Sequence, residues 1–136
     1  MCGIAGIVGH KGGWESLASA LRASQECLRH RGPDDSGRYI ADDAGTGLVH
    51  TRLAILDRSD AGHQPMISAD GRHVIVLNGE IYNFRALRAG LEQRGVRFRS
   101  QTDTEVVLHL YSEHGEECLR LLEGMFALAI WDTREK

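Results

Sequence analysis

Cys2 is the residue in this sequence with the clearest capacity for covalent chemistry. Once the initiator methionine is removed, a step that a small following side chain favours, Cys2 carries both a thiol and a free α-amino group. An unperturbed thiol has a pKa of roughly 8.5 and an α-amine a pKa of roughly 7.7–8.0. The amine can therefore act as a base near neutral pH, and the thiolate is a strong nucleophile. Residue type alone also allows Cys2 to be a small apolar residue at the start of a strand.

The elements around Cys2 are predicted from hydrophobic periodicity. Residues 4–8 form an apolar, β-branched run, which predicts a buried strand that fixes the start of the chain in the core. Strands outnumber helices and the helices come in separated groups, which indicates an α+β layered fold. Further strands are predicted at residues 38–40, 46–50, 74–77, 96–98 and 125–131, and helices at 14–30, 83–95, from 102 onward and at 116–122.

Several polar stretches have plain structural readings from their residue types. Residues 31–37 are a polar connecting loop, and Arg52 is a solvated cation at the end of a strand. Asn78-Gly79 is typical of a type I′ hairpin turn, although a helix N-cap at Asn83 so soon afterwards disfavours a simple hairpin. Asp103 lies in a capping box, which marks the start of a helix.

The composition is typical of one soluble globular domain. The chain has 136 residues, of which 42% are apolar and 26% charged. Its net charge of −3 gives no electrostatic case for nucleic-acid binding, and no apolar run approaches the roughly 20 residues that span a membrane. Three cysteines without a Cys-x-x-Cys pair, and no secretion signal, indicate reduced thiols in the cytoplasm. The seven histidines are scattered without metal-ligand spacing, so no metal site is expected.

A series of motifs runs along almost the whole chain: Met1–Gly9, Arg31–Gly37, His50–Asp57, Gly62–Met66, Asn78–Asn83, Thr102–Glu105 and Leu122–Ala127. Together they resemble the class II glutamine amidotransferases, which are N-terminal-nucleophile hydrolases. They are most similar to the glutaminase domain of glutamine-dependent asparagine synthetase. The Arg-Gly-Pro-Asp-Asp and His-Gln-Pro-Met elements favour this branch over the glucosamine-phosphate synthase and amidophosphoribosyltransferase branches.

The resemblance implies a fold and a reaction. The fold is a four-layer αββα sandwich, α+β in class, and the reaction hydrolyses glutamine to glutamate and ammonia. The Cys2 thiol would attack the side-chain amide carbon of glutamine, and its own α-amine would relay the proton. The Asn78 side chain and the Gly79 backbone N–H would stabilise the negative charge on the amide oxygen. Glycine suits that position because it lets the backbone approach the substrate closely.

The resemblance also implies how a free amino acid is held. Arg52 is similar to the residue that binds the α-carboxylate, since a guanidinium can bind two oxygens at once. Asp103 would pair with the α-ammonium. Arg31 and Asp34 would belong to a loop that closes over the site, with no role assigned to either. The rest of the pocket would be lined by Leu53, Ala54, Ile55, Leu56 and Glu80.

In the family that these motifs resemble, the glutaminase domain continues past the equivalent of Trp131-Asp132, and a second domain binds ATP to activate aspartate. We therefore expect residues 1–136 to be an incomplete glutaminase domain that lacks its last strands and the ATP-binding synthetase domain. Glutamine hydrolysis itself should need no cofactor, whereas ATP and magnesium belong to the synthetase domain. An unpaired sheet edge could join two copies into a homodimer.

Two alternatives are compatible with the same motifs. The chain could be a truncated fragment that binds glutamine weakly and does not catalyse. It could also be the amidotransferase half of a ligase with another acceptor, because the acceptor is chosen by the missing domain.

Overall fold

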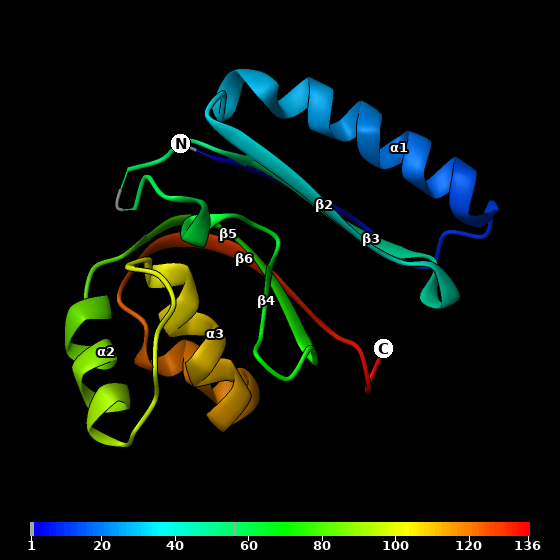
Figure 1. Ribbon diagram of the computed structural model, residues 1–136. Helices are drawn as coiled ribbons and strands as arrows, with labels where there is room; N and C mark the ends of the chain where they lie inside the picture. The colour runs from blue at the N-terminus through cyan, green and yellow to red at the C-terminus, as the bar shows by residue number, and fades with distance from the viewer. Residues whose placement is uncertain (1, 56) are drawn as a thin grey trace.

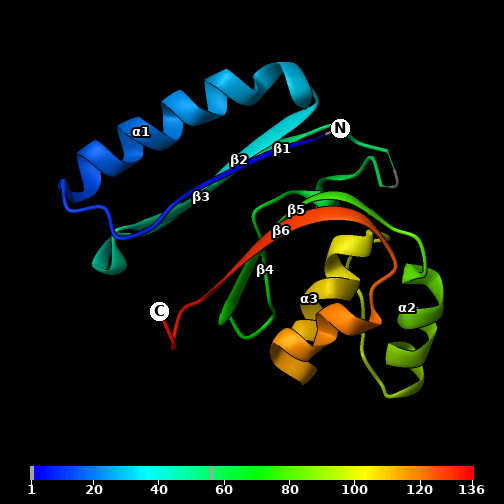
Figure 2. The ribbon, with the colours of Figure 1, turned by 180° about the vertical axis from the view of Figure 1, so that it is seen from behind.

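Figure 1 shows the computed structural model of the chain, in which residues 2–55 and 57–136 are described. Two three-stranded sheets are stacked face to face, and helices cover both outer faces. The layers follow one another as α1, the first sheet, the second sheet, and α2 with α3, and Figure 2 shows the same order from behind. The expected four-layer α+β arrangement is therefore confirmed.

The first sheet meets a helix on one face and the second sheet on the other. Its antiparallel strands are β1 (Gly3–Ile7), β3 (Thr46–Arg52) and β2 (Asp35–Ala41), in the order β1-β3-β2. Alternate residues of a strand face opposite sides of its sheet. Val49 accordingly packs against Leu21 of α1 (Gly13–Leu28), whereas Leu48 packs against Val76 of the second sheet.

The second sheet leaves part of its central strand without a strand neighbour. Its strands are β4 (Met66–Ile67), β5 (His73–Ile81) and β6 (Gly124–Asp132), in the order β4-β5-β6. Helices α3 (Asp103–His114) and α2 (Phe84–Gln93) lie on its outer face. β4 pairs only with Val74 and Ile75 of β5. Among the described residues, no strand therefore pairs with the β4 side of β5 from Leu77 to Ile81.

Three local features agree with what their residue types favour. The apolar run at residues 74–77 is buried on both faces of the sheet. The chain turns between β4 and β5 at Asp70-Gly71, where Gly71 has a φ of +74°. Helix α2 gives way to Gly95, with a φ of +91°, and the N–H groups of Gly95 and Val96 donate to the carbonyls of Glu92 and Leu91. This is the Schellman arrangement, which satisfies carbonyls that the end of a helix leaves free.

Other local predictions are wrong. Residues 96–98 form no strand, because the polar backbone that follows them binds a carboxylate of α3 rather than a neighbouring strand. The predicted helix at 116–122 is a 3₁₀ segment, Gly115–Leu121. Asn83 precedes α2 but does not cap it: its side chain donates to the Leu121 carbonyl and accepts from the Glu123 N–H.

The local readings of two polar stretches are also wrong. Asn78-Gly79 is neither a turn nor past the end of a strand, because both residues lie inside β5 and pair with Ala127 and Phe126 of β6. The predicted loop at 31–37 ends earlier than expected, since β2 begins at Asp35. Within the described part of the chain, no helix combines the length and the apolar character needed to cross a membrane.

The packing of α1 on the first sheet yields a stability prediction. Leu21 is fully buried against Val49, so Leu21→Ala should lower the free energy of unfolding by about 2–5 kcal/mol. Arg22, the exposed neighbour on the same helix, is the matched control, and Arg22→Ala should change this free energy by no more than about 0.5 kcal/mol. Chemical denaturation measures both. Equal effects of the two substitutions would contradict the packing of α1 described above.

Candidate active site

A pocket of about 120 Å³ opens where β1, β3 and β5 meet the start of α3. Of the residues that the sequence predicts for the site, it brings together Cys2, Arg52, Leu53, Ile55, Asn78, Gly79, Glu80 and Asp103. Ala54 is not among its lining residues. Leu56 and Met1, whose removal the sequence analysis expects, lie outside the described residues.

Strand alternation explains why these side chains meet. Ile4 of β1, Leu48 of β3 and Val76 of β5 all face the gap between the two sheets. Cys2 lies two residues before Ile4, and Arg52 and Asn78 lie an even number of residues from Leu48 and Val76. All three therefore belong to faces that look into the same gap. The apolar core between the sheets ends at these three residues, and the pocket begins there.

The Cys2 thiol lies against the backbone of Leu53. The Leu53 N–H donates to Sγ at 3.3 Å, and Sγ lies 3.7 Å from the Leu53 carbonyl oxygen. The carbonyl of Cys2 accepts a 2.9 Å hydrogen bond from Nε of Arg31. Both sides of the residue are thus tied down, although the strand after it is not buried as predicted: β1 is mostly half-buried, and Val8 lies past its end and is exposed.

The stretch around Arg31 is not a separate polar loop, because it binds Cys2, β3 and the residues that follow β3. Asp34 accepts the Ala54 N–H on Oδ2 at 2.8 Å, and its own N–H donates to the Arg52 carbonyl at 3.0 Å. Gly32 lies so close to β3 that an added Cβ would stand 2.3 Å from the carbonyl carbon of Thr51. The contacts of Asp34 hold the segment that begins at Arg52.

The N–H of Gly79 is directed toward the pocket by the alternation of β5. Successive N–H groups of a strand point to opposite edges. The Leu77 N–H donates to Oε1 of Gln64 at 2.7 Å, and the Ile81 N–H donates to Oδ2 of Asp103 at 3.0 Å, both away from β6. Gly79 lies midway between these residues, so its N–H faces the same edge.

Asn78 and Gly79 have distinct structural requirements. The side-chain Oδ1 of Asn78 is buried and has no hydrogen-bond partner among the described residues, which is costly unless a ligand supplies one. Gly79 has a φ of +149°, and an added Cβ would stand 2.1 Å from the Met125 carbonyl oxygen. The close neighbour that excludes a side chain here is therefore the β6 backbone, and not a ligand as predicted from the sequence.

Arg52 is the buried cation of the pocket, with 7% of its surface exposed. Its Nη1 donates to the Ser59 carbonyl at 3.0 Å, and its Nη2 donates to the Asp57 carbonyl. Gly62 packs against the guanidinium so closely that an added Cβ would stand 2.1 Å from Nη2. A guanidinium has further N–H groups, so an anion can still bind it. The reading of Arg52 as a solvated cation is wrong.

Asp103 and Glu80 place two carboxyl groups in the same pocket. Asp103, the first residue of α3, accepts the Ile81 N–H on Oδ2 and the Thr104 N–H on Oδ1 at 2.9 Å. Burial nevertheless raises the Asp103 pKa. Burial also raises the Glu80 pKa, and the negative charge of Asp103 raises it further. A cationic ligand group would relieve both effects.

Two lining residues, Gln64 and Asp57, had no role in the sequence analysis. Gln64 bridges β5 and α3, because Oε1 accepts from Leu77 while Nε2 donates to Oγ1 of Thr104 at 3.1 Å. Asp57 accepts from Ser59 on Oδ1 and from the Gln101 N–H on Oδ2 at 2.9 Å. These hydrogen bonds lower the Asp57 pKa to about 2. Gln64 lies in the Gly62–Met66 motif and Asp57 in the His50–Asp57 motif, but only the fold shows what they contact.

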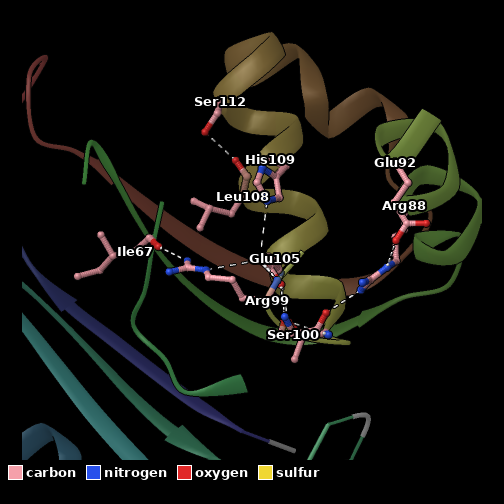
Figure 3. A network of polar contacts seen from close by, with 10 residues as sticks. Ile67, Arg88, Glu92, Arg99, Ser100, Glu105, Leu108, His109 and Ser112 are labelled. Atoms are coloured by element: carbon pink, nitrogen blue, oxygen red, sulfur yellow. Dashed lines mark hydrogen bonds and ion pairs between the residues drawn. The ribbon is translucent and has the colours of Figure 1, made fainter. Parts of the chain in front are cut away.

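A buried carboxylate, Glu105, holds the chain that leads into α3 (Figure 3). Its Oε1 accepts the Arg99 N–H at 2.8 Å, and its Oε2 accepts the N–H and hydroxyl of Ser100 at 2.7 and 2.6 Å. The predicted capping box is thus half formed: Thr102 Oγ1 accepts the Glu105 N–H, but the carboxylate reaches past Thr102. The held segment leads directly into Asp103, the first residue of α3. Glu105 therefore fixes one wall of the pocket.

The charge of Glu105 is stabilised where it lies. Burial alone would raise its pKa, but contacts from His109, Ser100 and the Arg99 backbone outweigh this and lower the Glu105 pKa to about 2.

In the described part of the chain, no three His, Cys, Asp or Glu side chains gather as a metal site would require.

The chain is similar to known proteins along its whole length. The whole chain, residues 1–136, matches the family described as "Glutamine amidotransferase domain". It is 43% identical over 136 residues to asparagine synthetase (glutamine-hydrolyzing) 3 of Arabidopsis thaliana, a match that covers 100% of this chain and 23% of that protein. It is 43% identical over 135 residues to asparagine synthetase B (glutamine-hydrolyzing) of Escherichia coli (strain K12), covering 99% and 24%. The chain thus spans about a quarter of the length of these relatives.

A solved structure shares the fold. The glutamine phosphoribosylpyrophosphate amidotransferase from B. subtilis, complexed with ADP and GMP, matches 97% of this chain and 35% of its own with a TM-score of 0.78. The sequence identity is 21%, so the likeness concerns the fold. It supports the four-layer arrangement that the motifs imply.

The Glu105 contacts predict a pH dependence of stability. The Glu105 pKa is about 2 in the folded chain and lies near its ordinary value of roughly 4.3 when unfolded. Its contribution to the free energy of unfolding is therefore complete above about pH 5 and is lost as the pH falls toward about 2. Glu105→Gln should be less stable than the parent chain at neutral pH and closer to it at low pH. Urea denaturation across this pH range measures the difference, and a difference that does not depend on pH would contradict the assignment.

Proposed function

Because this chain belongs to the class II glutamine amidotransferase family, we propose that it hydrolyses glutamine to glutamate and ammonia with Cys2 as the nucleophile. One observation carries the proposal: a single pocket holds the Cys2 thiol, the Asn78 side chain and the edge of β5 toward which Gly79 directs its N–H. The nucleophile comes from the first sheet and the two donors from the second. Acyl transfer needs the nucleophile beside the carbonyl carbon and the donors around the carbonyl oxygen.

The charged ends of the pocket suit the rest of a free amino acid. The α-carboxylate of glutamine would bind the remaining N–H groups of Arg52, and the α-ammonium would bind Asp103 with Glu80 nearby. The amide carbon would then lie next to Sγ of Cys2. Nδ2 of Asn78 would donate to the amide oxygen of the substrate, whereas the unpartnered Oδ1 only accepts and would bind an N–H of the substrate amide.

The reaction proceeds in two steps at the Cys2 sulfur. After removal of Met1, the free α-amine takes the thiol proton and sulfur attacks the amide carbon, placing the carbonyl electron pair on oxygen, opposite Asn78 and Gly79. The carbon–nitrogen bond breaks, the amine returns the proton to the leaving nitrogen, and ammonia and a thioester form. Water then attacks the thioester, giving up its proton through the amine to the leaving thiolate. Glutamate is released and the thiol is restored.

The ammonia would serve ATP-dependent synthesis of asparagine from aspartate in a longer protein of which these residues would form one domain. Two observations support this: two relatives that are each 43% identical to this chain are glutamine-hydrolysing asparagine synthetases, and the chain spans about a quarter of their length. ATP and magnesium would bind the synthetase domain of that protein, while hydrolysis at Cys2 uses only the thiol, the amine and water. A reducing cytoplasm is the proposed location, because the mechanism requires a free thiol at Cys2.

Ammonia release from glutamine tests the proposal directly. Cys2→Ala should abolish turnover while keeping a small residue after Met1, so that processing continues. Asn78→Ala should lower kcat roughly 100- to 1000-fold, the effect expected from losing one donor to a developing negative charge. Intact mass spectrometry establishes whether Met1 is removed.

Cys27→Ala is the matched control, since Cys27 is an exposed thiol on α1, and it should retain full activity. A chain with a processed Cys2 that releases no ammonia would refute the proposal for residues 1–136. Turnover that persists in Cys2→Ala would refute the role of the thiol.

The raised pKa of Asp103 predicts how binding depends on pH. A protonated Asp103 cannot pair with an ammonium group, so glutamine affinity should rise with pH as this carboxyl ionises, and then level off. Asp103→Asn should weaken binding by about 1.5–3 kcal/mol, or roughly 10- to 150-fold, at neutral pH and flatten this dependence. Calorimetry on the Cys2→Ala background, where no turnover interferes, measures both effects. An unchanged pH dependence in Asp103→Asn would assign the ammonium to another group.

A further inference from the structure

His50 is a buried histidine that the reaction described above does not use. It lies in the middle of β3 with 1% of its surface exposed. Its Nε2 lies 3.1 Å from the carbonyl oxygen of Leu77 on β5, so the side chain crosses from the first sheet to the second. A carbonyl oxygen only accepts hydrogen bonds, which places the ring proton on Nε2.

The buried ring is a weak base. Burial lowers the His50 pKa to about 4. The charged groups around it act in both directions: Asp35 of β2 raises the pKa, and Arg52 of β3 and His63 before β4 lower it. The second ring nitrogen, Nδ1, is buried without a hydrogen-bond partner among the described residues.

The carbonyl that His50 holds lies at the unpaired edge of β5. Where a strand neighbour would bind Leu77, side chains do so instead: His50 binds the carbonyl, and Gln64 binds the N–H at 2.7 Å. Asn78 and Gly79 follow directly. β6 pairs with both donors on the other side of β5. On this side, where no described strand lies, their placement relative to the first sheet depends on how firmly Leu77 is held.

His50 also shares a sheet with the nucleophile. It pairs with Ile4 in the register of β1 and β3, and Cys2 lies two residues before Ile4. The hydrogen bond to Leu77 is thus a direct polar link between the sheet that carries the thiol and the strand that carries the donors. A change in this link alters the separation between the two.

We propose that His50 is a positioning residue, whose neutral ring sets the distance between the Cys2 thiol and the Asn78–Gly79 donors by holding the Leu77 carbonyl. This inference rests on the proposed function for its catalytic consequence. The geometric part does not depend on it.

Steady-state ammonia release from glutamine, measured on three variants, tests the catalytic part. His50→Leu removes the donor and should lower kcat about 10- to 100-fold, the cost of a small misplacement of reacting groups, with KM within about twofold of the parent value. His50→Gln keeps an N–H that can reach the same carbonyl and should restore most of kcat. Val49→Ala, on the same strand but facing α1, matches the loss of core packing and should leave kcat unchanged.

Two kinetic outcomes would overturn the proposal. One is an equal loss of kcat in His50→Leu and His50→Gln, or in Val49→Ala. The other is a loss confined to KM, or no loss. In His50→Gln, the acid limb of the plot of kcat against pH must also fall at the same pH as in the parent chain. A shifted limb would mean that His50 acts as an acid or base in the reaction.

Nitrogen-15 NMR of the unliganded parent chain tests the geometric part and needs neither activity nor a folded variant. We expect the His50 ring to be protonated on Nε2 and to stay neutral down to about pH 5. A ring protonated on Nδ1, or one that titrates near its ordinary pKa of roughly 6.5, overturns the proposal. If the parent chain releases no ammonia, the proposed function fails on that result, and the ring spectrum alone decides whether His50 holds Leu77.

Discussion

The unpaired edge of β5 is the constraint on which the candidate site depends. β4 is only two residues long, so Leu77, Gly79 and Ile81 present backbone groups with no strand of the described chain opposite them. Buried backbone groups need partners. Gln64 and His50 supply them for Leu77, and Asp103 supplies one for Ile81, which leaves Gly79 facing the pocket. The location of the pocket thus follows from the length of one strand.

Buried charge is the second physical theme of the site. Arg52, Asp103 and Glu105 are each at least nine-tenths buried, and an unpaired charge at such depth is expensive. Arg52 and Glu105 are satisfied largely by backbone groups, which cannot rotate away as side chains do. Asp103 is satisfied only in part, since burial still raises its pKa. Glu105, which holds a wall of the site, is therefore well paired, whereas Arg52 and Asp103, which face the proposed ligand, can still bind a further group.

Much of the site could be predicted from motifs, and less from local sequence. The motifs predicted Cys2, Arg52 and Asp103, and the fold brings them to one pocket. Local preference alone placed Asn78-Gly79 in a turn, because this dipeptide is common in hairpins, but pairing with β6 some distance along the chain overrides that preference. The same limit applies to residues 96–98, whose apolar pattern resembles a strand although no partner strand lies beside them among the described residues.

The pairing of Asn78 and Gly79 with Ala127 and Phe126 also fixes when the site can form during synthesis. Cys2 leaves the ribosome among the first residues, and β1 can pair with β3 once about fifty residues are out. The strand that carries the donors gains its partner only when β6 has emerged. Until β6 emerges, the nascent chain therefore carries a thiol without the partner strand that positions the two donors opposite it.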